Sequence, residues 1–366
     1  MMYYLHRFSE HFGPFNVFFY ITFRAGAAWV TAFLFSVICG EYVIRTLTAL
    51  KLGQPIRAAA EVHRLAELHG GKQGTPTMGG VLIIGAVFIS SIIWARLDNR
   101  FVWLALFAMV YLGALGFTDD YLKVTKKNTA GVSGRYKLLF QLILALVITG
   151  VFLTSPLLEV QARSLYLPFV KAPVIDNMSW FTFFFFALVI VGASNAVNLT
   201  DGLDGLAIGC TITSALAYAV LSYVAGNFRL AEYLSVPFYP FTAELTVVCT
   251  ALIGAGFGFL WFNCHPAKVF MGDTGSLAIG GLIGVVAICC KQEVLLIVVG
   301  GVFVVEALSV ILQVISFQAT GRRIFLMSPL HHHFELAGWK ENTVIVRFWI
   351  LSGICALLGL ATLKLR

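Results

Sequence analysis

Two adjacent aspartates, Asp119 and Asp120, stand at the end of an apolar segment in the run Gly-Phe-Thr-Asp-Asp-Tyr. If that segment is a helix, the negative end of its dipole and the mutual repulsion of the pair disfavour two ionised carboxylates, so a cation is expected beside them. A divalent metal ion would serve, and so would Lys123, Lys126 and Lys127. The same repulsion could raise the pKa of one carboxylate enough to make it a general base. The alternative is a solvated acidic turn that the lysines balance.

A second polar run joins two apolar segments and holds Asn195, Asn198, Asp201 and Asp204. Asp201 and Asp204 are three positions apart, so they would share one face if this run were helical. Hard oxygen ligands on a short loop at a membrane surface suit magnesium held jointly by carboxylates and a substrate phosphate. Helix capping alone would explain one of these aspartates but not the whole set.

Two glycine-containing runs stand at the starts of further apolar segments. Asp273 lies in Phe-Met-Gly-Asp-Thr-Gly-Ser, whose glycines leave room for a ligand to approach the backbone closely. In the other run, Thr-Pro-Thr-Met-Gly-Gly, we expect Thr75 to cap a helix and Pro76 to occupy its first turn. Helix N-termini that converge on one membrane face would form an anion site for a diphosphate. Ordinary capping by threonine and aspartate is compatible with the same sequence and does not exclude a ligand.

Three consecutive histidines, His331, His332 and His333, follow the run Ser-Pro-Leu. Consecutive histidines can bind a transition metal such as zinc, although three adjacent imidazoles do not readily face one ion on a regular helix or strand. A hairpin loop that aims one or two rings at phosphate, as donors or as a proton carrier, is the alternative. Glu306 stands inside a long apolar run, where a charged group is costly, so it is either functional or held neutral or hydrogen-bonded within the bundle.

Helices in a membrane must position these residues. Of 366 residues, 59% are hydrophobic and only 12% are charged, about half the charged share of an average soluble domain. Ten apolar segments approach the roughly 20 residues that a membrane-spanning helix needs. We expect helices at Ala25–Ile44, Met78–Ala95, Phe101–Phe117, Leu138–Leu153, Trp180–Val197, Gly205–Val224, Leu245–Phe262, Gly275–Cys290, Val294–Phe317 and Val344–Leu363.

Charge and acidic chemistry gather on one side of this predicted topology. The loops after the odd-numbered spans carry most of the lysines and arginines, which places those loops in the cytoplasm and both termini in the periplasm. Five of the seven aspartates fall in the same loops, so the active site is expected on the cytoplasmic face. With no long linker or internal repeat, residues 1–366 are predicted to form a single all-α, polytopic membrane domain. Anionic lipid explains the net charge of +7 better than nucleic acid does.

Taken in order, the motifs closely resemble those of the bacterial phospho-N-acetylmuramoyl-pentapeptide transferases, within the polyprenyl-phosphate N-acetylhexosamine-1-phosphate transferase superfamily. The resemblance rests on Gly74-Thr-Pro-Thr-Met-Gly-Gly, Asp119-Asp-Tyr, Asn195-Ala-Val-Asn-Leu-Thr-Asp-Gly-Leu-Asp-Gly, Phe270-Met-Gly-Asp and Pro329-Leu-His-His-His-Phe-Glu. It implies ten helices in the bacterial inner membrane, a homodimer, and magnesium-dependent transfer of phospho-MurNAc-pentapeptide from its UDP carrier to undecaprenyl phosphate. The products would be lipid I and UMP.

The resemblance also implies roles for single residues. Asp273 would be the principal magnesium ligand, Asp119 the base that deprotonates the lipid phosphate with Asp120 beside it, and Lys72 would grip phosphate. The three histidines are candidate catalytic residues at the pyrophosphate or the sugar. The candidate substrate-binding residues are Thr77, Lys123, Lys127, Asn195, Asn198, Asp201, Asp204, Asn263 and Phe270, with the Phe270 ring expected to stack on uracil.

Two rival functions stay open on the sequence alone. A related enzyme would transfer N-acetylglucosamine-1-phosphate, although the uninterrupted Pro-Leu-His-His-His-Phe-Glu run favours the muramoyl branch. A cation or proton transporter could use the aspartates and Glu306, but transporters place their binding groups near the midplane and often contain inverted repeats. For a transferase, a single displacement and a covalent route through an aspartate both agree with the sequence.

Overall fold

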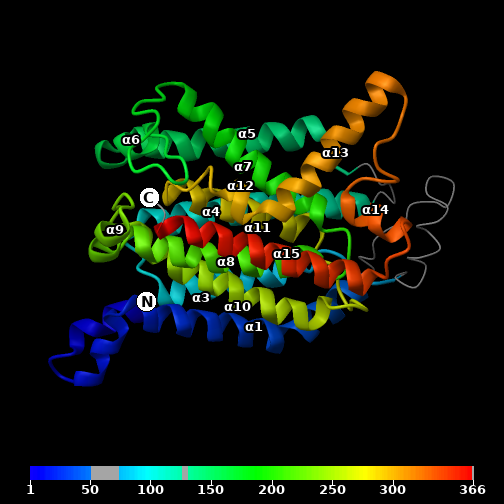
Figure 1. Ribbon diagram of the computed structural model, residues 1–366. Helices are drawn as coiled ribbons and strands as arrows, with labels where there is room; N and C mark the ends of the chain where they lie inside the picture. Colours follow the sequence, from blue (N-terminus) through cyan, green and yellow to red (C-terminus); the bar gives the residue numbers. More distant parts are fainter. Residues whose placement is uncertain (51–73, 126–130, 365–366) are drawn as a thin grey trace.

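The chain is described by a computed structural model for residues 1–50, 74–125 and 131–364, and in these ranges it is a bundle of long, roughly aligned helices (Figure 1). No strand occurs in the described ranges, where an isolated antiparallel bridge joins Leu165 and Ile175. The helices are η1 (Met2–Phe8), η2 (Gly13–Phe19), α1 (Ile21–Ala49), α3 (Gly80–Trp94), α4 (Arg100–Thr125), α5 (Gly134–Leu153), α6 (Pro156–Arg163), α7 (Phe181–Thr200), α8 (Leu206–Ala225), α9 (Phe228–Leu234), η4 (Thr242–Glu244), α10 (Leu245–Asn263), α11 (Gly272–Cys289), α12 (Leu296–Val299), α13 (Gly301–Thr320), α14 (Leu330–Leu336), α15 (Glu341–Ala361) and η5 (Thr362–Lys364).

The prediction of an all-α, polytopic membrane protein is confirmed. Among the described residues, nine helices are long and apolar enough to cross a membrane, and α3 is a shorter apolar helix. Each of the ten predicted segments overlaps one of these helices, and the ends differ by up to eight residues. The N-terminus and the C-terminal end of the described chain lie at the same end of the bundle, opposite α14 (Figure 1). The compartment that each end faces stays a prediction.

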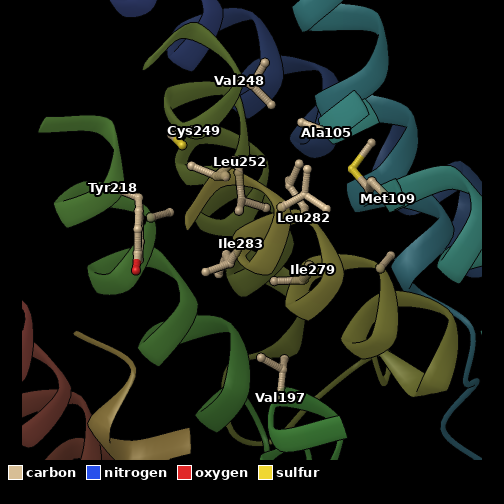
Figure 2. Packing of buried hydrophobic residues seen from close by; sticks show 14 of the residues in the cluster. Ala105, Met109, Val197, Tyr218, Val248, Cys249, Leu252, Ile279, Leu282 and Ile283 are labelled. Carbon is tan, nitrogen blue, oxygen red and sulfur yellow. The ribbon is translucent and has the colours of Figure 1, made fainter. Parts of the chain in front are cut away.

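Helix α11 lies at the centre of the bundle and packs against α4, α7, α3 and α8. Its apolar window is 89% buried, so α11 is enclosed by protein and has little contact with lipid. Figure 2 shows how the apolar side chains of several helices interdigitate here. The labelled residues are Ala105 and Met109 of α4, Val197 of α7, Tyr218 of α8, Val248, Cys249 and Leu252 of α10, and Ile279, Leu282 and Ile283 of α11.

Small residues allow α11 to approach the backbones of its neighbours. A Cβ placed on Gly80 of α3 would lie 2.2 Å from the Cα of Gly275. A Cβ placed on Gly116 of α4 would lie 2.1 Å from the carbonyl oxygen of Asp273. Helices in lipid associate through such small-residue contacts, because they gain little hydrophobic energy from one another. Gly116 therefore sets the spacing between α4 and α11, the helices that carry the acidic residues, and Gly80 sets the spacing between α3 and α11.

The ninth predicted span, Val294–Phe317, is wrong as a continuous helix. It divides into a single turn, α12, and the long helix α13. Gly300 and Gly301 meet at the break, and glycine is a poor helix former. Gly301 also faces α15 closely, because a Cβ there would lie 2.8 Å from the sulfur of Cys355. From this break α13 leaves the bundle, and its apolar window is only 28% buried (Figure 1).

The start of α3 also differs from the prediction, because the helix begins at Gly80 and neither Thr75 nor Pro76 lies in its first turn. Met78 has a φ of 71°, a left-handed conformation that a right-handed helix cannot contain. The Phe270 N–H instead donates a hydrogen bond to the Pro76 carbonyl at 2.8 Å. This contact ties the chain before α3 to the chain before α11.

Candidate active site

Two packed helices bring three aspartates together. Asp119 and Asp120 lie inside α4, which continues to Thr125 instead of ending near them, and Asp273 lies in the first turn of α11. One carboxylate oxygen from each aspartate lies within 4.8 Å of the other two. Asp119 and Asp120 are buried, whereas the side chain of Asp273 is 14% exposed. A ligand can therefore reach the group through Asp273.

Two lysines lie between Asp119 and Asp273. The Nζ of Lys123 is 2.6 Å from Asp119 Oδ2 and 3.1 Å from Asp273 Oδ2. The Nζ of Lys137, near the start of α5, is 2.9 Å and 2.7 Å from the same two oxygens. Lys123 was a candidate from the sequence, whereas Lys137 was missed. Its only sequence signal was positive charge beside an apolar segment, which many loop lysines share.

Asp120 holds the first turn of α11. Its Oδ2 accepts hydrogen bonds from the backbone N–H of Thr274 at 3.0 Å and from the Thr274 hydroxyl at 2.8 Å, and its Oδ1 accepts one from the Asp273 N–H at 3.3 Å. The first N–H groups of a helix have no partner inside the helix and favour a negative charge. Among the described residues, Asp119 accepts one backbone hydrogen bond, from Val132 at 2.6 Å. Asp120 therefore fixes the backbone that carries Asp273.

The chemistry of this group suits magnesium. Its donors are carboxylate oxygens, the hard ligands that magnesium prefers, and a magnesium site commonly takes one or two carboxylates and completes its shell with water and substrate phosphates. Asp119 and Asp273 could hold such an ion, because their Oδ2 atoms face each other across the two lysines. Asp120 is less suited as a ligand, since its oxygens already accept three hydrogen bonds.

The polar run between α7 and α8 sends its two aspartates to different places. Residues 201–205 form turns, so Asp201 and Asp204 do not share a helical face. The Asp201 carboxyl lies near the backbone of Gly272, beside the three-aspartate group. Burial, together with repulsion from Asp273 and Asp120, raises the pKa of Asp201 to about 8. A proton or a cation is therefore expected at Asp201 near neutral pH.

A second acidic group lies at Asp204. Its Oδ2 accepts a hydrogen bond from the Ala267 N–H at 3.2 Å and lies 2.9 Å from His265 Nδ1. The Asp204 N–H donates to Glu341 Oε1 at 3.2 Å, at the start of α15. By distance alone, Asp204, His265 and Glu341 could also hold a metal ion. Sequence reasoning did not connect them, because they come from three separate parts of the chain.

Two of the predicted substrate-binding residues shape the chain before α11. Asn263 is buried, and its Nδ2 donates to the Val269 carbonyl at 2.8 Å, which fixes the backbone next to the half-buried Phe270. Thr77 is also buried, and a Cβ placed on Gly272 would lie 2.8 Å from the Thr77 hydroxyl oxygen. Both residues therefore stand close to the segment that carries Asp273.

The other predicted polar residues are less closely tied to this group. The Asn195 amide donates to Gln141 Oε1 at 3.0 Å, so it joins α7 to α5. Asn198 is half-buried, and its backbone carbonyl accepts a hydrogen bond from the Asp201 N–H. The predicted phosphate-binding Lys72 and the candidate Lys127 lie outside the described residues.

The three histidines lie in the short helix α14, so the predicted hairpin loop is wrong. Successive residues of a helix point about 100° apart, because one turn takes 3.6 residues. Their rings accordingly have separate partners and do not converge on one ion in the described structure. The nearest partners are Glu306 Oε2 for His331 (3.3 Å), Glu335 Oε2 for His332 (2.9 Å) and the backbone N–H of Leu326 for His333 (3.2 Å).

An apolar groove lies where α13 leaves the bundle. Its volume is about 180 Å³, and its lining includes Leu188 and Val197 of α7, Ile297 of α12 and Phe303 of α13. Leu188 and Ile297 are exposed, so the groove opens on the side that would face lipid. Val197 stands one helical turn before Asp201, so the lining reaches the end of α7 that leads into the acidic group.

Comparisons with known proteins agree with this arrangement. The profile of glycosyl transferase family 4 matches residues 102–291, and the phospho-N-acetylmuramoyl-pentapeptide-transferase signature 1 matches residues 72–84. A phospho-N-acetylmuramoyl-pentapeptide-transferase of Methylacidiphilum infernorum (isolate V4) is 54% identical over 366 residues, which cover 100% of both chains. The family match includes Asp119, Asp120 and Asp273, and the signature covers the start of α3.

Proposed function

The chain belongs to the phospho-N-acetylmuramoyl-pentapeptide transferases of glycosyl transferase family 4, and we propose that it transfers phospho-MurNAc-pentapeptide from its UDP carrier to undecaprenyl phosphate, giving lipid I and UMP. One observation carries this proposal. Asp119 and Asp273 face each other with the ammonium groups of Lys123 and Lys137 between them. Fixed carboxylates and cations suit a reaction between two phosphates, which brings several negative charges together.

In the proposed reaction, an oxygen of the lipid phosphate attacks the phosphorus that bears the sugar, and the bond from that phosphorus to UMP breaks. Asp119 accepts the proton of the lipid phosphate. Lys123 and Lys137 turn from the carboxylates to the phosphate oxygens and hold them with charge-assisted hydrogen bonds. A magnesium ion held by Asp273 and Asp119 would neutralise charge on the diphosphate. Asp120 keeps the first turn of α11, and so Asp273, in place.

The two substrates would approach from different sides. The apolar groove along α7, α12 and α13 suits the polyprenyl chain, because Leu188 and Ile297 are exposed on the lipid side. A polyprenyl chain in this groove would place the lipid phosphate near Asp201 at the end of α7. On the other side, the Phe270 ring would stack on uracil, with Asn263 shaping its loop and Asn198 near the nucleotide.

The cellular setting follows from the same family and from the distribution of charge. We propose a bacterial inner-membrane location, with the acidic group on the cytoplasmic face and both termini in the periplasm. The apolar helices and the excess of lysine and arginine in alternate loops support this orientation. We also propose that the chain is one domain that forms a homodimer. Light scattering of the protein in detergent would measure the number of chains.

Release of UMP by the purified protein tests the proposed activity. With UDP-MurNAc-pentapeptide, undecaprenyl phosphate and magnesium, we expect release that stops on addition of EDTA and in Asp273→Asn. A parallel reaction with UDP-GlcNAc identifies the other branch of the superfamily, since release with that substrate alone contradicts the muramoyl assignment. No release with either substrate, in a preparation shown to be folded, would reject the transferase and favour the transporter.

A further inference from the structure

Glu306 is a buried carboxylate on α13 that the proposed reaction does not use. Its side chain is fully buried, and among the described residues it faces the ring of His331, with 3.3 Å between Glu306 Oε2 and His331 Nδ1. Glu306 Oε1 also accepts a hydrogen bond from the backbone N–H of His331 at 3.1 Å. A carboxylate buried in a membrane helix is costly unless it is paired. The two contacts hold both the backbone and the ring of His331.

The other side of the His331 ring lies against the turn between α7 and α8. A Cβ placed on Gly202 would lie 2.2 Å from His331 Nε2, so only glycine leaves room for this ring. Gly202 follows Asp201, whose carboxyl lies near the backbone of Gly272, beside Asp273. The ring therefore connects α13 to the turn that borders the three-aspartate group.

Both ring nitrogens of His331 lack a hydrogen bond in the described structure, although the ring is buried. Glu306 Oε2 likewise has no hydrogen bond. A small rotation of either side chain would turn its 3.3 Å contact with Nδ1 into a hydrogen bond. Nearly all buried polar atoms have partners, and each exception needs a reason. For Nδ1 the partner is at hand in Glu306. For Nε2 none is at hand among the described residues, which points to an atom of the substrate.

We propose that Glu306 is a positioning residue for His331 in the transfer reaction. It keeps a proton on Nδ1 and so presents Nε2 to the transferred phosphosugar. A carboxylate beside one ring nitrogen selects the tautomer and the orientation of an imidazole. The inference rests on the proposed function, and it separates His331 from His332 and His333, whose rings have other partners.

A double-mutant cycle on UMP release tests the proposal. Glu306→Gln keeps the volume and an acceptor for the His331 N–H, but it offers Nδ1 an amide that can donate and favour the other tautomer. We expect kcat to fall about 10- to 100-fold, the usual range for a group that orients a functional histidine, with KM changed less than about threefold. Glu306→Asp, which keeps the carboxylate, should recover part of the loss.

The coupling between the two residues distinguishes positioning from general support of the fold. We expect Glu306→Gln to cause no further loss of kcat in a His331→Gln background, because Glu306 acts through the ring. Losses that multiply in the double variant would overturn the proposal, and so would an unchanged kcat in Glu306→Gln. If Glu306→Gln does not fold, Glu306→Asp is measured in the wild-type and His331→Gln backgrounds. The proposal then requires that Glu306→Asp cause no further loss of kcat in His331→Gln.

Ser309 supplies the matched control. It is buried one turn further along α13, and its hydroxyl donates to the Glu306 carbonyl at 2.7 Å. Ser309→Ala removes a buried polar contact from the same helix without touching His331, so we expect kcat within about twofold of wild type, since one neutral hydrogen bond contributes little net stability. A Ser309→Ala loss as large as that of Glu306→Gln would overturn the proposal. No UMP release by the wild-type protein would instead reject the proposed function.

Discussion

Two groups of side chains in the described chain could hold a metal by distance, and they differ in what neutralises them. In the first group, lysine side chains lie between the carboxylates. In the second, the contacts seen among the described residues are backbone N–H groups and one imidazole nitrogen. A lysine on a flexible stem can turn away when a metal and phosphates arrive, whereas a backbone donor moves only with its chain. The first group is Asp119, Asp120 and Asp273, and the second is Asp204, His265 and Glu341.

The comparison teaches that closeness of carboxylates does not by itself define a metal site. The second group joins the α7–α8 turn, the α10–α11 loop and the start of α15, so its contacts hold these three segments together. The first group joins two packed helices, and its positive charge comes from groups that can be exchanged. We therefore expect the metal at Asp119 and Asp273, with Asp204 holding the turn that borders the site.

The largest effect should separate the two groups directly. Asp273→Asn should lower UMP release about 10³-fold or more, as expected when a group that stabilises charge in the transition state is lost. Asp204→Asn, the matched change in the second group, should cost less than about tenfold, because it removes no proposed metal ligand. Single-turnover assays at saturating magnesium measure both. Equal losses of UMP release in the two variants would contradict the assignment of the metal to the first group alone.

The lysines should give the next largest effect. Lys137→Met should lower kcat/KM about 100-fold, because a fixed positive charge on the phosphates is lost, and Lys137→Arg should recover part of it. Arg135 offers a matched control, since it is an exposed cation near the start of the same helix, α5. Arg135→Met should stay close to wild type. A similar loss at both positions would indicate general attraction of anions in place of a specific contact.

Asp120 should show a smaller effect that includes stability. Asp120→Ala removes the acceptor for the first N–H groups of α11, and loss of such a cap costs roughly 0.5–2 kcal/mol. Asp120→Asn keeps an acceptor oxygen for Thr274 and should unfold at a higher temperature than Asp120→Ala. Thermal unfolding in detergent measures the difference. If Asp120→Asn were as inactive as Asp273→Asn at full stability, Asp120 would be a metal ligand and not a support.

The smallest change in activity should come from His265, the partly exposed member of the second group. The side chain of His265 is 33% exposed, and partly exposed ion pairs contribute little. His265→Gln should therefore change activity less than about threefold and leave unchanged the magnesium concentration for half-maximal rate. Asp119→Asn should raise that concentration. A magnesium titration of both variants measures the contrast, and a shift in His265→Gln would place the metal in the second group.

Most of the fold could be predicted from the sequence, because lipid imposes a simple rule on the chain. A segment that crosses lipid must satisfy its own backbone groups, so a long apolar run such as Leu138–Leu153 becomes a helix. The errors arose where tight packing overrules hydropathy. The break at Gly300 and the late start of α3 at Gly80 both occur beside close contacts with another helix.

The candidate site was predictable only in part. Aspartates at the ends of apolar runs signalled the chemistry, so Asp119 and Asp273 were found. No spacing reveals Lys137, because it is 136 positions from Asp273, or the pairing of His331 with Glu306. Asp201 and Asp204 show the converse, since two neighbours in sequence serve different groups in space.

By itself, the sequence determined that this chain is a bundle of membrane helices with most of its aspartates gathered at one end. Hydropathy and charge can be read residue by residue along the chain, so they need no knowledge of which helices pack together. Only the tertiary structure decided which of those acids meet. Asp120 reaches the first turn of α11 across 153 positions, because glycines let α4 and α11 pack closely. Which lysines, histidines and backbone groups surround each carboxylate follows from that packing.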